Sequence, residues 1–192
     1  MEEKTLYTKT DCTETGYGCS IQGKVVVLDQ KLQSPDRRNQ LFYCTGGNGA
    51  GSNPIGRSVF MVSLSDGEFS RWNRSDVIGI LKPELLPDAA KLHLSQLRPA
   101  GALDLKHHTP TYSGYSFLPD GRHAAGVWLC TEQEVLDYVE MQKPYQHRIM
   151  ICDRNDFCVL EMQEQVLLYP TSAELELAAF TKSEIEPRMK IL

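Results

Sequence analysis

The segment 41–79 constrains the fold of this 192-residue chain more than any other part of it. Residues 41–45 and 58–64 are rich in apolar, β-branched and aromatic side chains, which favour strands. The twelve residues between these two runs include five glycines and Pro54, a composition typical of a long loop. Asp66-Gly67 then predicts a tight turn into a returning strand at 68–72, because this pair readily supplies the positive φ that a short hairpin needs. We therefore expect an antiparallel meander.

Side chains in the 58–64 run alternate between the two faces of the predicted strand. Val59 and Met61 point to one face, and Phe60, Val62 and Leu64 point to the other. Both faces are apolar, whereas a sheet with one wet face shows polar residues on that side. The pattern predicts a sheet that is covered on both sides or curled into a small barrel.

The rest of the chain adds one strand and one helix to the first half and a second α+β unit. Residues 25–28 predict a strand, and residues 83–98 carry leucine and alanine at helical spacing before Pro99. In the second half we expect strands at 115–118, 124–130, 147–152, 157–162 and 166–169. Thr131 and Glu134 form a capping box before one helix, and a second box at 171–174 predicts a final helix.

These elements predict an α+β protein of two units. The first is a β-rich domain at 1–98, an antiparallel meander or small barrel with one helix. A linker follows at 99–113, and an acidic ββαβββα domain occupies 114–192. Residues 1–24 predict an irregular arm or one short strand at 5–8.

Composition excludes some classes of protein. The charged N-terminus lacks the apolar core of a secretion signal, and no apolar run approaches the ~20 residues of a membrane span. We therefore expect a cytoplasmic protein without a membrane partner, whose six cysteines are reduced. Residues 1–100 hold 12 Lys and Arg against 11 Asp and Glu, and residues 101–192 hold 8 against 14. The acidic second half has no basic excess of the kind that marks a nucleic-acid-binding domain.

The sequence predicts no phosphate-binding loop, no zinc site and no cysteine nucleophile. The glycine-rich loop lacks the lysine and the following helix of a phosphate-binding loop, so a hairpin loop is the simpler interpretation. The closest cysteine pairs, Cys12/Cys19 and Cys152/Cys158, are wider than zinc-site spacing. A nucleophile built from Cys44 or Cys152 has no base placed beside it by the sequence. We expect no catalytic residue, no metal ligand and no cofactor.

The segment 71–76 carries the strongest binding signal. Arg71, Trp72, Asn73 and Arg74 place an indole between two guanidiniums, and Arg57 lies at the end of the glycine-rich loop. Such groups stack on planar ligands and pair with carboxylates or phosphates, and they are common in interface hot spots. The alternative is that Trp72 belongs to the core and that Arg74 pairs with Asp76.

The run FYCTGGNGAG…GRSVFMVSLSDGEFSRWNRSDVIG…LPDAAKLHLSQL, residues 41–97, resembles a domain of small accessory proteins from conjugative elements and prophages of Gram-positive bacteria. Such proteins accompany antirestriction and anti-CRISPR factors, some of which block Cas9-type nucleases by direct binding. The resemblance implies an inhibitor carried by a mobile genetic element, and it assigns no role to any single residue.

Three functional hypotheses follow. The first is a non-enzymatic inhibitor, a candidate anti-CRISPR protein, that binds an RNA-guided nuclease or its nucleic-acid complex through the basic segment and an acidic surface of Glu132, Glu134, Asp137 and Glu140. The second is a nuclease or hydrolase that uses His123 or His147 with Asp120 or Asp153. The third is direct nucleic-acid binding through Arg57, Arg71, Trp72 and Arg74.

Overall fold

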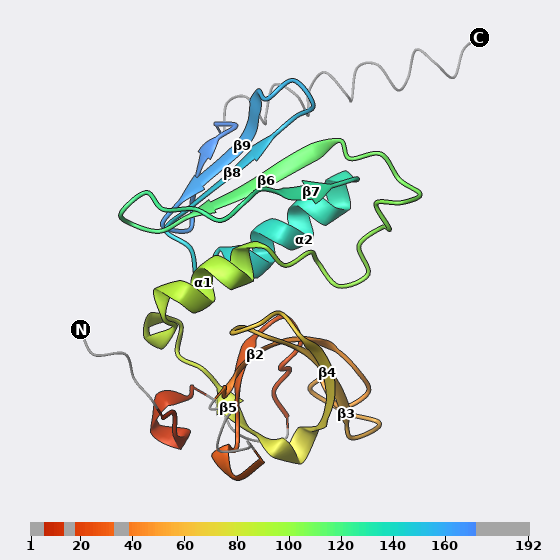
Figure 1. Ribbon diagram of the computed structural model, residues 1–192, viewed down its shortest axis with the longest axis vertical. Helices are drawn as coiled ribbons and strands as arrows, with labels where there is room; N and C mark the ends of the chain where they lie inside the picture. Colours follow the sequence, from red (N-terminus) through yellow and green to blue (C-terminus); the bar gives the residue numbers. More distant parts are fainter. Residues whose placement is uncertain (1–5, 14–17, 33–38, 172–192) are drawn as a thin grey trace.

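The computed structural model describes residues 6–13, 18–32 and 39–171, and shows an α+β protein with two five-stranded antiparallel sheets (Figure 1). The first sheet, in the order β4-β3-β2-β1-β5, contains β1 (Val25–Leu28), β2 (Leu41–Gly46), β3 (Ser58–Ser63), β4 (Phe69–Asn73) and β5 (Val77–Ile80). The second, in the order β10-β9-β8-β6-β7, contains β6 (Tyr112–Phe117), β7 (Val127–Leu129), β8 (Arg148–Cys152), β9 (Cys158–Gln163) and β10 (Val166–Tyr169). The helix predicted after residue 171 lies outside the described residues.

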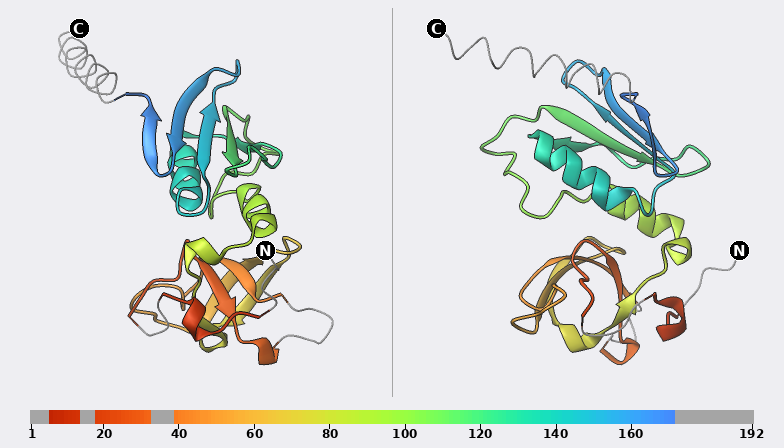
Figure 2. Two further views of the ribbon diagram at one scale, coloured as in Figure 1. Left: turned by 90° about the vertical axis from the view of Figure 1, so that its left-hand side faces the viewer. Right: turned by 180° about the vertical axis from the view of Figure 1, so that it is seen from behind.

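The first sheet curls into a small, partly open barrel (Figures 1 and 2). A strand that the sequence did not predict, β5, pairs with β1 at the edge of this sheet. The 3₁₀ helix Arg74–Asp76 joins β4 to β5, and the Asn73 side chain caps it by accepting from the Ser75 amide. This short capped connection carries the chain from one edge of the sheet to the other, which explains how a four-residue strand finds a distant partner.

The barrel is apolar on both faces for two different reasons. Its interior is a core of side chains from the strands, from the arm before β1 and from the glycine-rich loop: Ile21, Val26, Leu28, Phe42, Cys44, Ala50, Val59 and Met61. The other side chains of β1 and β2, among them Val25, Val27 and Tyr43, point outward into a second core shared with the helices. The expectation of a barrel or a doubly covered sheet is thus confirmed for β1 and β2.

Two α-helices lie between the barrel and the second sheet, α1 (Asp88–Ser95) and α2 (Glu132–Gln142) (Figures 1 and 2). The helix predicted over 83–98 is divided, because Pro87 forces Leu86 into extended backbone and α1 begins only after it. The predicted cap of α2 is confirmed, since the Thr131 side chain accepts from the Glu134 amide. Within the described residues, no helix is long and apolar enough to cross a membrane.

The helix layer contacts both sheets. Tyr138 of α2 is fully buried against the second sheet, and its hydroxyl donates to the Ser95 carbonyl oxygen at the end of α1. On the opposite side, Leu94, Met141 and Tyr145 share a core with outward side chains of β1 and β2. Helix α1, which the sequence prediction placed in the first domain, therefore contacts both halves. The division at residue 98 into separate domains stays a prediction.

Candidate macromolecule-binding surface

The outer face of β3 and β4 carries exposed aromatic and basic side chains. The register sets Ser58 opposite Asn73, Phe60 opposite Arg71, and Val62 opposite Phe69, and directly opposed residues share one face of an antiparallel pair. Phe60 and Phe69 stack with ring centroids 5.9 Å apart, and Phe69 is 62% exposed. Unlike the outer face of β1 and β2, this face has no helix of the described residues packed on it (Figures 1 and 2).

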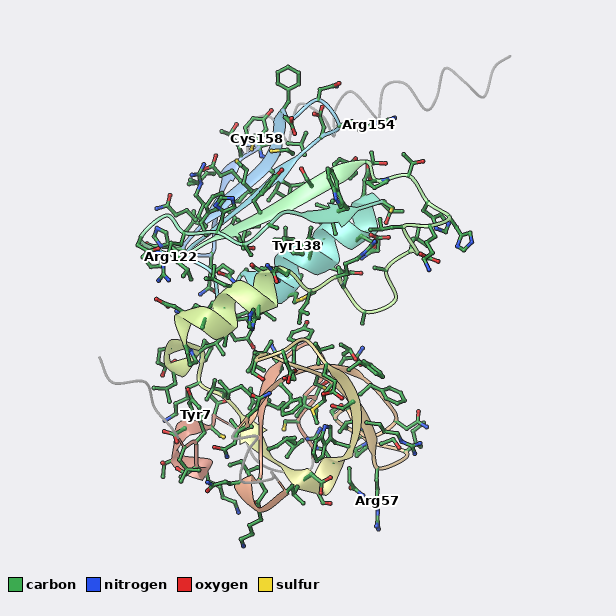
Figure 3. All side chains as sticks on the ribbon, in the orientation of Figure 1. Tyr7, Arg57, Arg122, Tyr138, Arg154 and Cys158 are labelled. Carbon is green, nitrogen blue, oxygen red and sulfur yellow. The ribbon has the colours of Figure 1, made fainter. Side chains whose placement is uncertain are left out.

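Two guanidiniums extend this aromatic pair. Arg57 and Arg71 are both exposed, and Figure 3 shows Arg57 pointing away from the barrel at the end remote from the helices. The Arg71 Nε donates to the Ser58 hydroxyl at 2.9 Å, which holds its planar head across the two strands. Both arginines line an open pocket of about 400 Å³ together with Trp72 and Asn73. We name Arg57, Phe60, Phe69 and Arg71 the guanidinium–aromatic surface.

Trp72 lies at the rim of this pocket but points mainly into the barrel. Its ring meets Phe42 edge to face at 5.9 Å, and its Nε1 donates to the Ser70 hydroxyl at 2.8 Å. Strand alternation explains the orientation, since Trp72 is paired with the interior residue Val59. The indole is partly buried and its one donor is satisfied, so Trp72 supports the pocket and exposes only part of its ring.

Phe60 and Phe69 were missed as site residues by the sequence analysis. Alternation correctly separated Phe60 from Val59, but the apolar face formed by Phe60 and Val62 was expected to be covered. Two phenylalanines flanking an Asp-Gly turn were the available signal, because residues opposed across such a hairpin share a face.

Arg74, predicted as a binding residue, is buried in the structure. Its Nη1 donates to the Gly49 carbonyl oxygen at 3.2 Å, and its Nη2 donates to the Cys19 carbonyl oxygen at 3.0 Å. These bonds tie the glycine-rich loop and the N-terminal arm to the end of β4. The Asp76 carboxylate accepts from the Asn73 amide instead of supplying an exposed charge. Arg74 is thus positioned to hold the loop in place.

The glycine-rich loop is folded back on β3. The Gly49 amide donates to the Ser58 carbonyl oxygen at 2.8 Å, and the Ile21 amide donates to the Ala50 carbonyl oxygen at 2.8 Å. A Cβ on Gly47 would lie 2.5 Å from the Ser58 carbonyl oxygen, and the φ of Gly47 is +109°. Only glycine fits there, so close backbone packing accounts for this position without a bound phosphate.

Arg74→Ala is expected to destabilise the protein by about 1–3 kcal/mol, because it removes the donor from the buried Gly49 carbonyl oxygen and from the partly buried Cys19 carbonyl oxygen. Arg71→Ala is the matched control, since it removes an exposed guanidinium three residues away and should change the free energy of unfolding by less than about 0.5 kcal/mol. Urea unfolding of both variants measures the difference. Equal losses would contradict the structural role of Arg74.

The predicted acidic residues separate into two groups. Glu132, Asp137 and Glu140 are exposed on α2. Glu134 is buried, and its carboxylate accepts from the Leu103 and Cys130 amides and from Arg98 at 2.6 Å. Burial alone raises the pKa of this carboxyl, but the three hydrogen-bond donors outweigh it and lower the pKa. Glu134 therefore ties the 98–103 segment to α2 and is not available to a partner.

The residues considered for catalysis make local contacts. Asp120 pairs with Arg122, and His123 lies over the Phe117 ring. The Asp153 carboxylate accepts from two amides of its own turn, and His147 lies beside Glu164. Among the residues with described positions, none of these histidines is paired with the aspartate proposed for it.

The cysteine chemistry is also unfavourable. Burial raises the pKa of the Cys44 thiol to about 11 and raises that of Cys152, so both stay protonated at neutral pH, and the thiolate is the nucleophilic form. In the part of the chain that the structure describes, no three or more His, Cys, Asp or Glu side chains gather in a way that could hold a metal ion.

Fold and surface together define an α+β protein with a partly open barrel whose outer face carries exposed arginine and phenylalanine. Comparisons with protein-family models, with curated proteins and with solved structures found no match.

Proposed function

We propose that this protein is a non-enzymatic binding protein whose guanidinium–aromatic surface contacts a macromolecular partner. The observation that carries the proposal is the exposure of the stacked Phe60 and Phe69 beside Arg57 and Arg71. Large apolar side chains are normally buried on folding, and a contiguous exposed group of them marks an interaction site.

The chemistry of this surface fits a partner with planar and anionic groups. Arginine pairs bidentately with carboxylates and phosphates, and phenylalanine rings stack on aromatic side chains or bases. The two guanidiniums face a common pocket, so one anionic group could contact both. Arg71 is held in place by Ser58 before any partner binds, which lowers the entropy that binding must remove.

The likeness of residues 41–97 to accessory proteins of mobile elements supports a specific class of partner, a Cas9-type nuclease. Such enzymes hold nucleic acid in positively charged channels. The exposed carboxylates of α2, those of Glu132, Asp137 and Glu140, would face such a channel, while the guanidinium–aromatic surface anchors the protein elsewhere. The mechanism is occlusion, and it requires no bond to be made or broken.

The test is binding to a guide-loaded Cas9-type nuclease, followed by inhibition of DNA cleavage. The double variant Arg57→Ala/Phe69→Ala is expected to bind at least about tenfold more weakly, because hot-spot truncations cost about 2 kcal/mol or more. Arg154→Ala is the matched control, since Arg154 is an exposed arginine in a turn of the second sheet (Figure 3). Full inhibition by the double variant, or equal weakening by the control, would reject the proposal.

Direct binding of single-stranded nucleic acid is a second candidate, favoured by the stacked phenylalanine pair beside two exposed arginines. Fluorescence anisotropy with labelled single-stranded DNA, without nuclease, separates it from the first. Binding that weakens in the double variant and falls steeply with salt would support this candidate. Shortened strands after incubation, with or without EDTA, would instead indicate a hydrolase.

A further inference from the structure

A second pocket, of about 360 Å³, lies between the barrel and the helix layer. The barrel contributes Lys24 and Tyr43 to its wall, and α2 contributes Asp137, Glu140 and Met141. Pro99, in the segment after α1, also lines it. None of these residues belongs to the guanidinium–aromatic surface, so the two sites are separate.

The hydroxyl of Tyr43 is the most informative group in this pocket. Tyr43 is only 5% exposed, yet among the described residues its hydroxyl has no hydrogen-bond partner. Its neighbour is Gly23, where an added Cβ would lie 3.7 Å from the hydroxyl oxygen. Burial, with the nearby Tyr145, Cys44 and Asp137, raises the pKa of this phenol, so it stays neutral and can donate or accept one hydrogen bond. The side chain of Tyr43 is thus nearly buried while its hydroxyl opens into the pocket, where it can bond to a ligand.

The charges around the pocket favour a cationic ligand. Asp137 and Glu140 supply two carboxylates to the lining and Lys24 supplies one ammonium, while Lys143 pairs with Glu140 from outside the lining. One oxygen of Asp137 accepts from Gln133 at 2.9 Å, and one oxygen of Glu140 accepts from Lys143 at 2.6 Å. Both contacts lie on the exposed surface, where such pairs contribute little and rearrange at low cost. The second oxygen of each carboxylate can accept from a ligand, while Met141 and Pro99 offer apolar surface.

We infer that this pocket binds a ligand that carries a guanidinium or a primary ammonium on a short apolar stem. The carboxylates of Asp137 and Glu140 accept from the cationic head, the Tyr43 hydroxyl accepts one further N–H, and Met141 packs on the stem. The volume suits a single group of this size. The same chemistry is found in a free diamine or guanidino-amine and in a lysine or arginine side chain of a polypeptide. The inference goes beyond the proposed function and uses a different part of the barrel.

The test is titration of the full chain with agmatine, and separately with a short end-blocked peptide whose only charged side chain is one arginine, followed by ¹H–¹⁵N NMR. We expect shifts of Gly23, Thr45 and Ala100, which line the pocket. Asp137→Asn/Glu140→Gln is expected to weaken binding by at least about tenfold, and Tyr43→Phe by several-fold, because charged and neutral hydrogen bonds are lost respectively. Binding of agmatine and the peptide supports a small amine or a side chain as source, and binding of the peptide alone supports a side chain.

Glu132→Gln is the matched control, because it removes a carboxylate from the same helix without touching the pocket. Equal weakening by this variant would show general charge attraction and overturn the inference. No shift of pocket residues with either probe would overturn it too. Since agmatine binding is read without a macromolecular partner, and Arg57→Ala/Phe69→Ala leaves this pocket intact, the two proposals fail independently.

Discussion

Glu134→Ala is expected to reduce the free energy of unfolding by about 3–5 kcal/mol, the usual cost of removing one partner of a buried ion pair. The carboxylate is 6% exposed and holds Arg98 at 2.6 Å, and it also accepts from the Leu103 and Cys130 amides. All three donors lose their acceptor at once. Urea denaturation measures the loss, and Glu132→Ala on the exposed side of the same helix is the control, with an expected change within about 0.5 kcal/mol.

The stabilisation from Glu134 should also depend on pH in a defined direction. The pKa of its carboxyl is lowered in the folded state from the ordinary value of 4.5. The stabilisation is therefore fully present above pH 4.5 and is lost as the pH falls through the lowered folded-state pKa. The difference in unfolding free energy between the wild type and Glu134→Gln should be constant near neutral pH and shrink in acid. A difference that grows in acid would contradict the assignment.

Tyr145→Ala is expected to have an effect of similar size, about 3–5 kcal/mol, the usual range for truncating a large buried aromatic side chain. Tyr145 follows α2 and packs in the core shared with β1 and β2. Its hydroxyl accepts from the Val25 amide of β1 at 3.0 Å, and burial raises the pKa of this phenol, so it stays neutral. The variant removes both the packing and the hydrogen bond that join the helix layer to the barrel.

Tyr145→Phe separates these two contributions. It keeps the ring and leaves the Val25 amide without an acceptor, which should cost about 1–3 kcal/mol. Calorimetry then shows whether the two halves unfold together. One transition for the wild type and two for Tyr145→Ala would support a single cooperative body joined by this core. Two transitions for the wild type would show that the halves fold separately, as the prediction of two domains expects.

Local sequence patterns were sufficient to predict most of the helices, strands and turns. The Asp66-Gly67 turn, the Thr131 side-chain cap and the alternation in β3 each depend on residues a few positions apart, and each is found in the structure. The reciprocal half of the predicted capping box is absent, because Glu134 accepts from the Cys130 amide and not from that of Thr131. Strand β5 was missed, because a four-residue strand at the edge of a sheet is defined by its pairing with β1, some fifty residues earlier. The helix at 83–98 was too long because the effect of Pro87 on Leu86 was not applied.

For the candidate site, too, local sequence predicted some features and tertiary contacts decided the others. The sequence by itself determined that guanidinium groups and an indole gather at the end of β4 and that carboxylates line one stretch of α2. Only the tertiary structure decided that Arg71 and Asp137 are exposed while Arg74 and Glu134 are buried. Arg71 and Arg74 have the same charge and lie three residues apart, as do Glu134 and Asp137. The difference in burial depends on which arginine meets the glycine-rich loop and which carboxylate meets the 98–103 segment. Such contacts join residues distant in sequence, and no local pattern encodes them.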